Sequence, residues 1–244
     1  MKRHRLLFVA ALCVVSLLPA SAADVFAQAG AWEKPYDQWT LKEVEQILTD
    51  SPWAQTRSKG VSLSVGDPLF SAGANPDTEG VLIRLRSSPV VRLAVLRHRQ
   101  IKEKFDKMDE RARAAFMEKN RLMLECQPCR ENYVVTLGPP PGTTKGVPSA
   151  LRLMTLAALK QSIRLVDERG RRRELVHFDA PKADGDEATF FFARADERGE
   201  PLLTTASKTL AVTLDPAVFG TSAIKITRIE FDVPKLILKG AVMF

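Results

Sequence analysis

The chain has 244 residues, with 36 Lys or Arg and 29 Asp or Glu, and a formal net charge of +7. This length can bury a sizeable core in one domain or in two small ones. Basic and acidic residues alternate, and no dense basic stripe with interleaved aromatic residues occurs, so nucleic-acid binding is not expected.

The first 29 residues have the order of a secretory signal peptide. A basic start (residues 2–5) precedes an apolar run (residues 6–18), and two small-residue cleavage patterns follow, ending at Ala22 and Ala29. The apolar run is shorter than the about 20 residues that span a bilayer comfortably. We therefore expect a cleaved signal over 1–29 and a periplasmic or extracellular protein, with an uncleaved anchor as the alternative.

Segment 30–58 predicts a short amphipathic helix. Thr40 is a favourable N-cap, and Glu43 three residues later completes a capping box. Pro52 ends the helix, because the residue before a proline avoids helical geometry. The apolar stripe consists of Leu41, Val44, Ile47 and Leu48.

The stretch "KPYDQWTLKEVEQILTDSPWAQT", Lys34–Thr56, resembles the opening of an uncharacterised family of exported bacterial proteins. The shared features are an aromatic-rich start, a short helix and the sequence Ser-Pro-Trp-Ala. The final strands of the chain show a looser similarity. The resemblance implies export and a shared fold, and it implies no activity and no catalytic residues.

All three tryptophans, Trp32, Trp39 and Trp53, fall in this same segment. Exposed indole rings would be able to stack on sugar rings. The preferred interpretation is that they fix the N-terminal helix to the body of the protein, since each indole buries a large apolar area.

A helical insertion is predicted after the first strand. Glu79–Ser88 alternates as a strand, and Pro89 suits the first turn of a helix that runs, as one helix or two in tandem, to about Glu125. One face of this helix is an apolar stripe that is expected to face the core: Ile101, Phe105, Met108, Ala112 and Phe116. The other face is charged, as on a helix that packs on one side only.

The rest of the chain reads as short strands. A strand is expected at 133–137, and Ser149 is expected to cap a short helix that ends at Leu159. The sequence Asp-Glu-Arg-Gly occurs at 167–170 and 196–199, and its glycine supplies the positive φ of a tight turn. The other expected strands are 162–166, 174–178, 189–194, a segment from Leu202, 209–214, 224–233 and 236–244.

These elements predict an α+β protein that is mainly β: an antiparallel β-sandwich-like domain with a helical insertion. The expected organisation is a signal over 1–29, a Trp-rich segment over 30–58 and a single β-rich domain over 59–244. The insertion occupies about residues 89–125 of that domain.

Cys126 and Cys129 remain once the signal, with Cys13, is removed. The preferred interpretation is a local disulfide, which persists outside the cytoplasm. A thiol oxidoreductase site is the alternative, although the pair follows a helix, where the dipole disfavours a thiolate. A structural zinc site needs four ligands, and only the distant His98 and His177 are available, so neither metal nor another cofactor is expected.

The cluster Arg169, Arg171, Arg172 and Arg173 offers a second candidate binding surface, for an anionic polymer or headgroup. A solvated hairpin tip is the preferred interpretation. The sequence has no nucleophile elbow and no Walker loop. The leading hypothesis is a non-catalytic binding or envelope-associated module, whose partner would be another envelope protein or an anionic surface. The alternative is an extracytoplasmic enzyme, either a thiol-disulfide protein or a hydrolase whose site the sequence does not locate.

Overall fold

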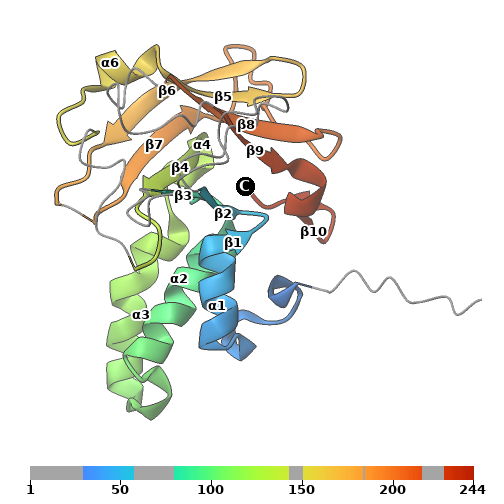
Figure 1. The fold of residues 1–244 in the computed structure, drawn as a ribbon. Coiled ribbons are helices and arrows are strands. Elements are labelled where there is room, and N and C mark those ends of the chain that lie inside the picture. The colour runs from blue at the N-terminus through green and yellow to red at the C-terminus, as the bar shows by residue number, and fades with distance from the viewer. Residues whose placement is uncertain (1–29, 58–79, 143–150, 184, 216–227) are drawn as a thin grey trace, which may run out of the picture. The chain divides into compact units, whose positions relative to one another are not determined.

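The computed structural model describes residues 30–57, 80–142, 151–183, 185–215 and 228–244 (Figure 1). Ala31–Phe244 form one compact unit. Within the described part, no helix is long and apolar enough to cross a membrane.

The centre of this unit is a nine-stranded sheet in which every neighbouring pair is antiparallel. Its order is β1-β2-β3-β4-β7-β6-β5-β8-β9. The predicted α+β class with mainly β structure is confirmed. The strands are β1 (Asp50–Ser51), β2 (Ala54–Arg57), β3 (Val81–Leu85), β4 (Asn132–Gly138), β5 (Ile163–Asp167), β6 (Arg172–Asp179), β7 (Ala188–Ala193), β8 (Thr209–Leu214) and β9 (Arg228–Asp232).

The three longest α-helices gather on one side of this sheet. Figure 1 shows α1, α2 and α3 side by side, with α6 at the opposite end of the sheet. The α-helices are α1 (Leu41–Thr49), α2 (Pro89–Lys102), α3 (Glu110–Glu125), α4 (Pro128–Glu131) and α6 (Leu156–Lys160). The 3-10 helices are η1 (Ala31–Glu33), η2 (Tyr36–Gln38), η4 (Phe105–Lys107) and η6 (Val233–Leu236).

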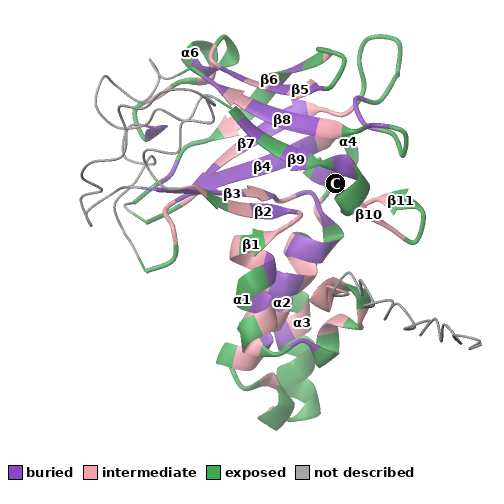
Figure 2. Cartoon of the chain, turned by 45° about the vertical axis from the view of Figure 1, so that its right-hand side comes forward, coloured by how far each residue is buried: buried purple, intermediate pink, exposed green. Residues whose placement is uncertain are grey.

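The sheet curls, and its concave face encloses the main core. Side chains of β3 alternate as predicted, and Val81, Ile83 and Leu85 belong to the buried cluster. In β6 a bulge between Leu175 and His177 returns Phe178 to the core face. Buried residues extend along the central strands in Figure 2. The curl brings β9 to β2, where Gln55 Nε2 donates to the Glu230 main-chain oxygen at 2.8 Å.

Local capping chemistry sets the start of two helices as the sequence predicts. Thr40 Oγ1 accepts from the Glu43 amide at 3.3 Å, and the Glu43 carboxylate accepts from the Thr40 amide at 2.8 Å, which completes the capping box. Pro89 occupies the first turn of α2, and Ser88 caps it by accepting from the Val90 amide.

The helical insertion is a hairpin, so the apolar stripe predicted to run through it is interrupted. Lys104 adopts a left-handed conformation with φ of 56° and separates α2 from η4 and α3. Phe105 and Phe116 then meet across the turn, with ring centroids 5.0 Å apart. Arg99 Nη1 donates to Asn120 Oδ1 at 2.6 Å further along the pair. The two helices are therefore antiparallel.

The two Asp-Glu-Arg-Gly sequences form the same turn. In each, the glycine amide donates to the aspartate main-chain oxygen, at 3.1 Å for Gly170 and 2.9 Å for Gly199. Asp167 Oδ1 accepts from the amides of Arg169 and Arg171, and Asp196 Oδ1 accepts from the corresponding two amides. Both glycines have a positive φ, 77° and 79°. The carboxylate therefore fixes the turn while glycine supplies the conformation that other residues avoid.

Two predicted elements differ from the structure, and the predicted start of a third lies outside the described residues. The segment from Leu202 forms no strand. Between β7 and β8 the described chain makes one isolated bridge, between Ala195 and Pro201. Residues 236–244 do not join the large sheet; η6 turns the chain away into a separate hairpin of β10 (Ile237–Leu238) and β11 (Ala241–Val242). Helix α6 is capped by Thr155, and Ser149 lies outside the described residues.

Candidate functional site

A cavity of about 290 Å³ lies where the start of α2, the end of α3, α4 and the C-terminal hairpin meet. We call it the arginine pocket, because three arginines contribute to its wall. Its lining consists of Ser87, Pro89, Arg92, Glu125, Cys126, Cys129, Arg130, Arg194, Val242 and Phe244.

The two cysteines form one wall of the arginine pocket, and their sulfur atoms lie at disulfide distance with the Cα atoms 5.3 Å apart. Cys126 ends α3 in a left-handed conformation, and its amide donates to the Leu122 main-chain oxygen at 3.0 Å. Cys129 is buried within α4. The pair thus clasps the end of α3 to the one-turn helix that leads into β4.

Arg92 reaches the pocket from the first turns of α2. Its Nε donates to the Leu124 main-chain oxygen at 3.0 Å, and its Nη1 donates to that of Ser87. Burial, together with the nearby charges of Arg86 and Arg194, lowers the pKa of Arg92. The carbonyl groups orient this guanidinium without neutralising its charge.

Arg194 enters from the other side, just after β7. Its Nε donates to the Cys129 main-chain oxygen at 2.8 Å, and its Nη1 donates to that of Phe244 at 2.7 Å. The guanidinium carbon lies 4.6 Å from the centroid of the Tyr133 ring, a cation–π arrangement. Burial lowers the pKa of Arg194, and Tyr133 opposes this effect. Arg194 therefore connects the cysteine clasp to the C-terminal hairpin.

The electrostatic balance of the arginine pocket is positive. Arg130 adds a third guanidinium to the lining, and Glu125 is the single acidic residue there. Both Glu125 oxygens already accept from Arg121 Nη1 at 3.1 Å. Guanidinium groups bind carboxylate and phosphate oxygens through paired donors, so this geometry suits an oxyanion.

Sequence reasoning missed Arg92 and Arg194 as site residues. They are distant in the sequence, and each looks like an ordinary arginine on a helix or at a strand end. The fold brings them together by hydrogen bonds to main-chain carbonyl oxygens near the clasp. Any residue can supply such an oxygen, so these contacts cannot be recognised in the amino-acid sequence. Only Cys126 and Cys129 marked this region in advance.

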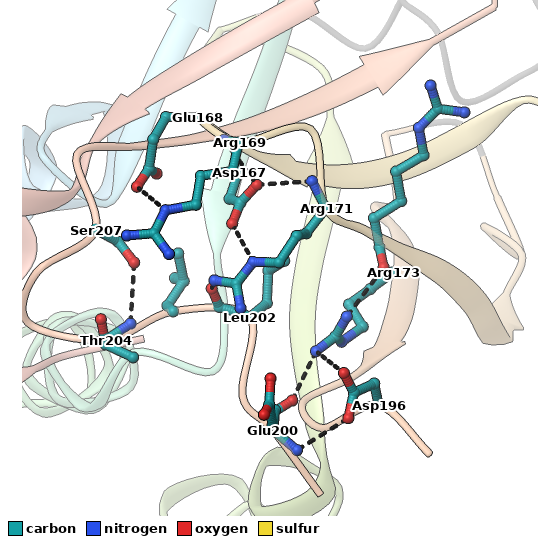
Figure 3. Close-up of polar contacts among 12 residues, drawn as sticks. Asp167, Glu168, Arg169, Arg171, Arg173, Asp196, Glu200, Leu202, Thr204 and Ser207 are labelled. Atoms are coloured by element: carbon teal, nitrogen blue, oxygen red, sulfur yellow. Dashed lines mark hydrogen bonds and ion pairs between the residues drawn. The ribbon is translucent and has the colours of Figure 1, made fainter. Parts of the chain in front are cut away.

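The predicted arginine cluster divides into structural and exposed members (Figure 3). Arg171 Nε donates to Asp167 Oδ2 at 2.6 Å, and its Nη2 donates to the Leu202 main-chain oxygen at 2.8 Å. Buried Arg173 donates to the Glu200 main-chain oxygen at 2.7 Å and faces Asp196. These two arginines hold the two repeated turns together.

Arg169 and Arg172 are exposed on the same hairpin. Arg169 Nε lies 3.9 Å from Glu168 Oε1, which is a loose pair at the surface. An anion-binding role for these two residues stays a prediction.

The three tryptophans surround α1 and pack toward the core. Trp39 and Trp53 are 2% and 0% exposed, and Trp32 lies edge-on to Trp53 with ring centroids 5.3 Å apart. The geometry shows packing, and a ligand-stacking role for these rings stays a prediction.

A second cavity, of about 680 Å³, lies between α1, α2 and β3. Its Arg84 pairs with Glu187 and also donates to the Leu48 main-chain oxygen. Burial is the main cause that lowers the pKa of its His98. Because Arg84 already has an acidic partner, this cavity offers less to an anionic ligand than the arginine pocket.

Neither a metal-binding group nor a similar protein identifies a function for these sites. Within the described ranges, no group of three or more His, Cys, Asp or Glu is placed to hold a metal ion. His177 lies 3.0 Å from Asp179 at the surface of β6. Comparison with protein-family models, curated proteins and solved structures finds no match to this chain.

Proposed function

We propose that this protein is an exported, non-catalytic binding module that acts in or on the cell envelope. The observation that carries the proposal is the arginine pocket, whose wall combines a clasped cysteine pair with three guanidinium groups. Such groups hold and orient an anion without needing a reactive nucleophile.

The cysteine pair and the N-terminal sequence both support export. Disulfides persist in oxidising compartments outside the cytoplasm and are rare inside it. The first 29 residues have the order of a secretory signal. The position of the clasp between α3 and β4 gives it a structural purpose, because it fixes the exit of the helical hairpin into the sheet.

A thiol-disulfide activity is the second candidate, and one observation favours it. Cys126 is partly exposed, Cys129 is buried, and the arginines of the pocket would stabilise a thiolate. The C-terminal dipole of α3 acts in the opposite direction at Cys126. The structural role of Cys129, whose carbonyl holds Arg194, makes us place this activity second.

An insulin-reduction assay, combined with thiol counting by mass spectrometry, separates the two candidates. We expect the native protein to contain no free thiol at Cys126 or Cys129 and to reduce insulin no faster than the Cys126→Ser variant. Cell fractionation on the same material should recover a processed protein outside the cytoplasm. Insulin reduction by the wild type that Cys126→Ser abolishes would replace the binding proposal with the thiol-disulfide one.

A further inference from the structure

We propose that the arginine pocket binds the carboxylate or phosphate group of a small organic anion through Arg92, Arg130 and Arg194. This inference rests on the proposed binding function and specifies the chemistry of its ligand. The hydrogen-bond donors, the charge and the size of the pocket each support it.

The pocket arginines keep hydrogen-bond donors that are available to a ligand. A guanidinium has five N–H donors. Arg92 uses Nε and Nη1 on main-chain oxygens, and its Nη2 has no hydrogen-bond partner among the described residues. Arg194 uses Nε and Nη1 in the same way and also interacts with the Tyr133 side chain. The carbonyl contacts therefore fix both groups in orientation, and Nη2 of Arg92 is left for a ligand.

The pocket carries more positive charge than its acidic groups offset. The Glu125 carboxylate is held by Arg121, and neither Arg92 nor Arg130 forms an ion pair with an acidic side chain of the described residues. Arg194 Nη1 donates to an oxygen of Phe244, the last residue of the sequence. Arg92 and Arg194 also repel each other, and burial opposes their charged forms. A bound anion would relieve both effects, because an opposite charge nearby favours the ionised guanidinium.

The size of the pocket and its lining suit a small ligand. A volume of about 290 Å³ lies just below the range of roughly 300–1,000 Å³ that is typical of ligand pockets. Pro89, Val242 and Phe244 add apolar surface to the lining. The pocket thus suits a molecule of about amino-acid size, with one charged group and a short apolar part, better than a polymer.

Calorimetric titration of the full chain, with its disulfide intact and at constant ionic strength, tests the inference. The probes are inorganic phosphate, N-acetylphenylalanine and the neutral amide of N-acetylphenylalanine. We expect saturable binding of at least one of the two anions, with the neutral amide binding about tenfold weaker or more. No saturable binding of either anion, or equal binding of the amide, would overturn the inference.

Two charge-matched variants locate the site. Arg130 is exposed, and its side chain forms no hydrogen bond or ion pair with another described side chain. Arg130→Gln should therefore leave the melting temperature unchanged and weaken anion binding about five- to tenfold. Arg111→Gln removes the same charge from the far end of α3 and should leave affinity unchanged. Equal effects of both variants would show that binding depends on net charge and not on the pocket, and would refute the assignment.

The insulin assay keeps the two proposals separable. If no probe binds and insulin also stays unreduced, the ligand chemistry is wrong while the binding function stands. If the wild type reduces insulin and Cys126→Ser does not, the proposed function itself fails.

Discussion

Gln55 and Glu230 join the two ends of the nine-stranded sheet. The Nε2 atom of Gln55, in β2, donates to the main-chain oxygen of Glu230, in β9, at 2.8 Å. Strand β9 is one edge of the sheet, and β2 is next to the other edge strand, β1. The hydrogen bond therefore connects the two sides that the curled sheet brings close to each other. An edge strand exposes unpaired polar groups, and this contact occupies one of them.

Replacing Gln55 with Ala should therefore weaken the closure of the sheet. We expect the free energy of unfolding to fall by about 0.5–1.5 kcal/mol, the usual net contribution of one hydrogen bond. Chemical denaturation measures this change. Gln38→Ala removes an exposed glutamine from η2 and should have little effect; equal losses in both variants would count against closure by Gln55.

Arg172 and Arg173 are neighbours in β6 with opposite environments, so they make a matched pair. Arg173→Met should lower the free energy of unfolding by about 1–3 kcal/mol, because it leaves the Glu200 carbonyl without its donor. Arg172→Met, at an exposed position, should be close to neutral. Denaturant titration of both proteins checks this prediction. An equally large fall in the free energy of unfolding for Arg172→Met would contradict the role of Arg173 in holding the two turns together.

The capping box of α1 should make stability depend on pH in the acid range. Hydrogen bonds from Lys34 and Thr40 lower the pKa of Glu43 from 4.5 to about 2. Because the folded-state pKa lies below the unfolded value, the carboxylate stabilises the fold above pH 4.5, and this contribution is lost as pH falls to about 2.

The comparison of Glu43→Gln with wild type isolates that effect. The melting temperature of the variant should be lower at pH 7, and the difference should disappear near pH 2. Glu45→Gln, an exposed residue on the same helix, serves as the control and should show no such dependence. A difference for Glu43→Gln that stays constant from pH 7 to pH 2 would refute the assignment.

Removal of residues 236–244 should yield an insoluble product. Leu236 is fully buried, and Phe244 packs on Tyr133 with ring centroids 5.1 Å apart. The truncation would uncover this part of the core, and it would also remove the main-chain oxygen that Arg194 contacts. Solubility and cooperative thermal unfolding of the truncated chain are the readouts, and a soluble, cooperatively folding product would contradict the expectation.

Much of the fold could be predicted because local chemistry determined it. The capping box at Thr40, the proline start of α2 and the two aspartate-glycine turns each need only neighbouring residues, and each was identified from sequence. The sequence left open one helix or two in tandem, and the position of the break at Lys104 was not identified, since a lysine with positive φ carries no sequence signal. The diversion of the C-terminus from the sheet depends on packing around Phe244, which periodicity does not reveal.

The candidate site was less predictable than the fold. The cysteine spacing pointed to the clasp, but Arg92 and Arg194 meet only because the α2–α3 hairpin and β7 converge there. The arginine cluster that was visible in sequence, Arg169–Arg173, proved to contain two members that hold turns together. Adjacent charges on a hairpin are easy to see, whereas a pocket assembled from distant arginines becomes visible only in three dimensions.

The reduction potential of the Cys126–Cys129 pair tests the central claim most directly. We propose that this pair is a structural clasp beside a binding pocket and not a redox centre. Equilibration with glutathione buffers, followed by alkylation and mass spectrometry, gives the potential. We predict that the pair stays oxidised to below about −300 mV, as structural disulfides do. A midpoint above about −230 mV, in the range of glutaredoxins and stronger oxidants, would contradict the account.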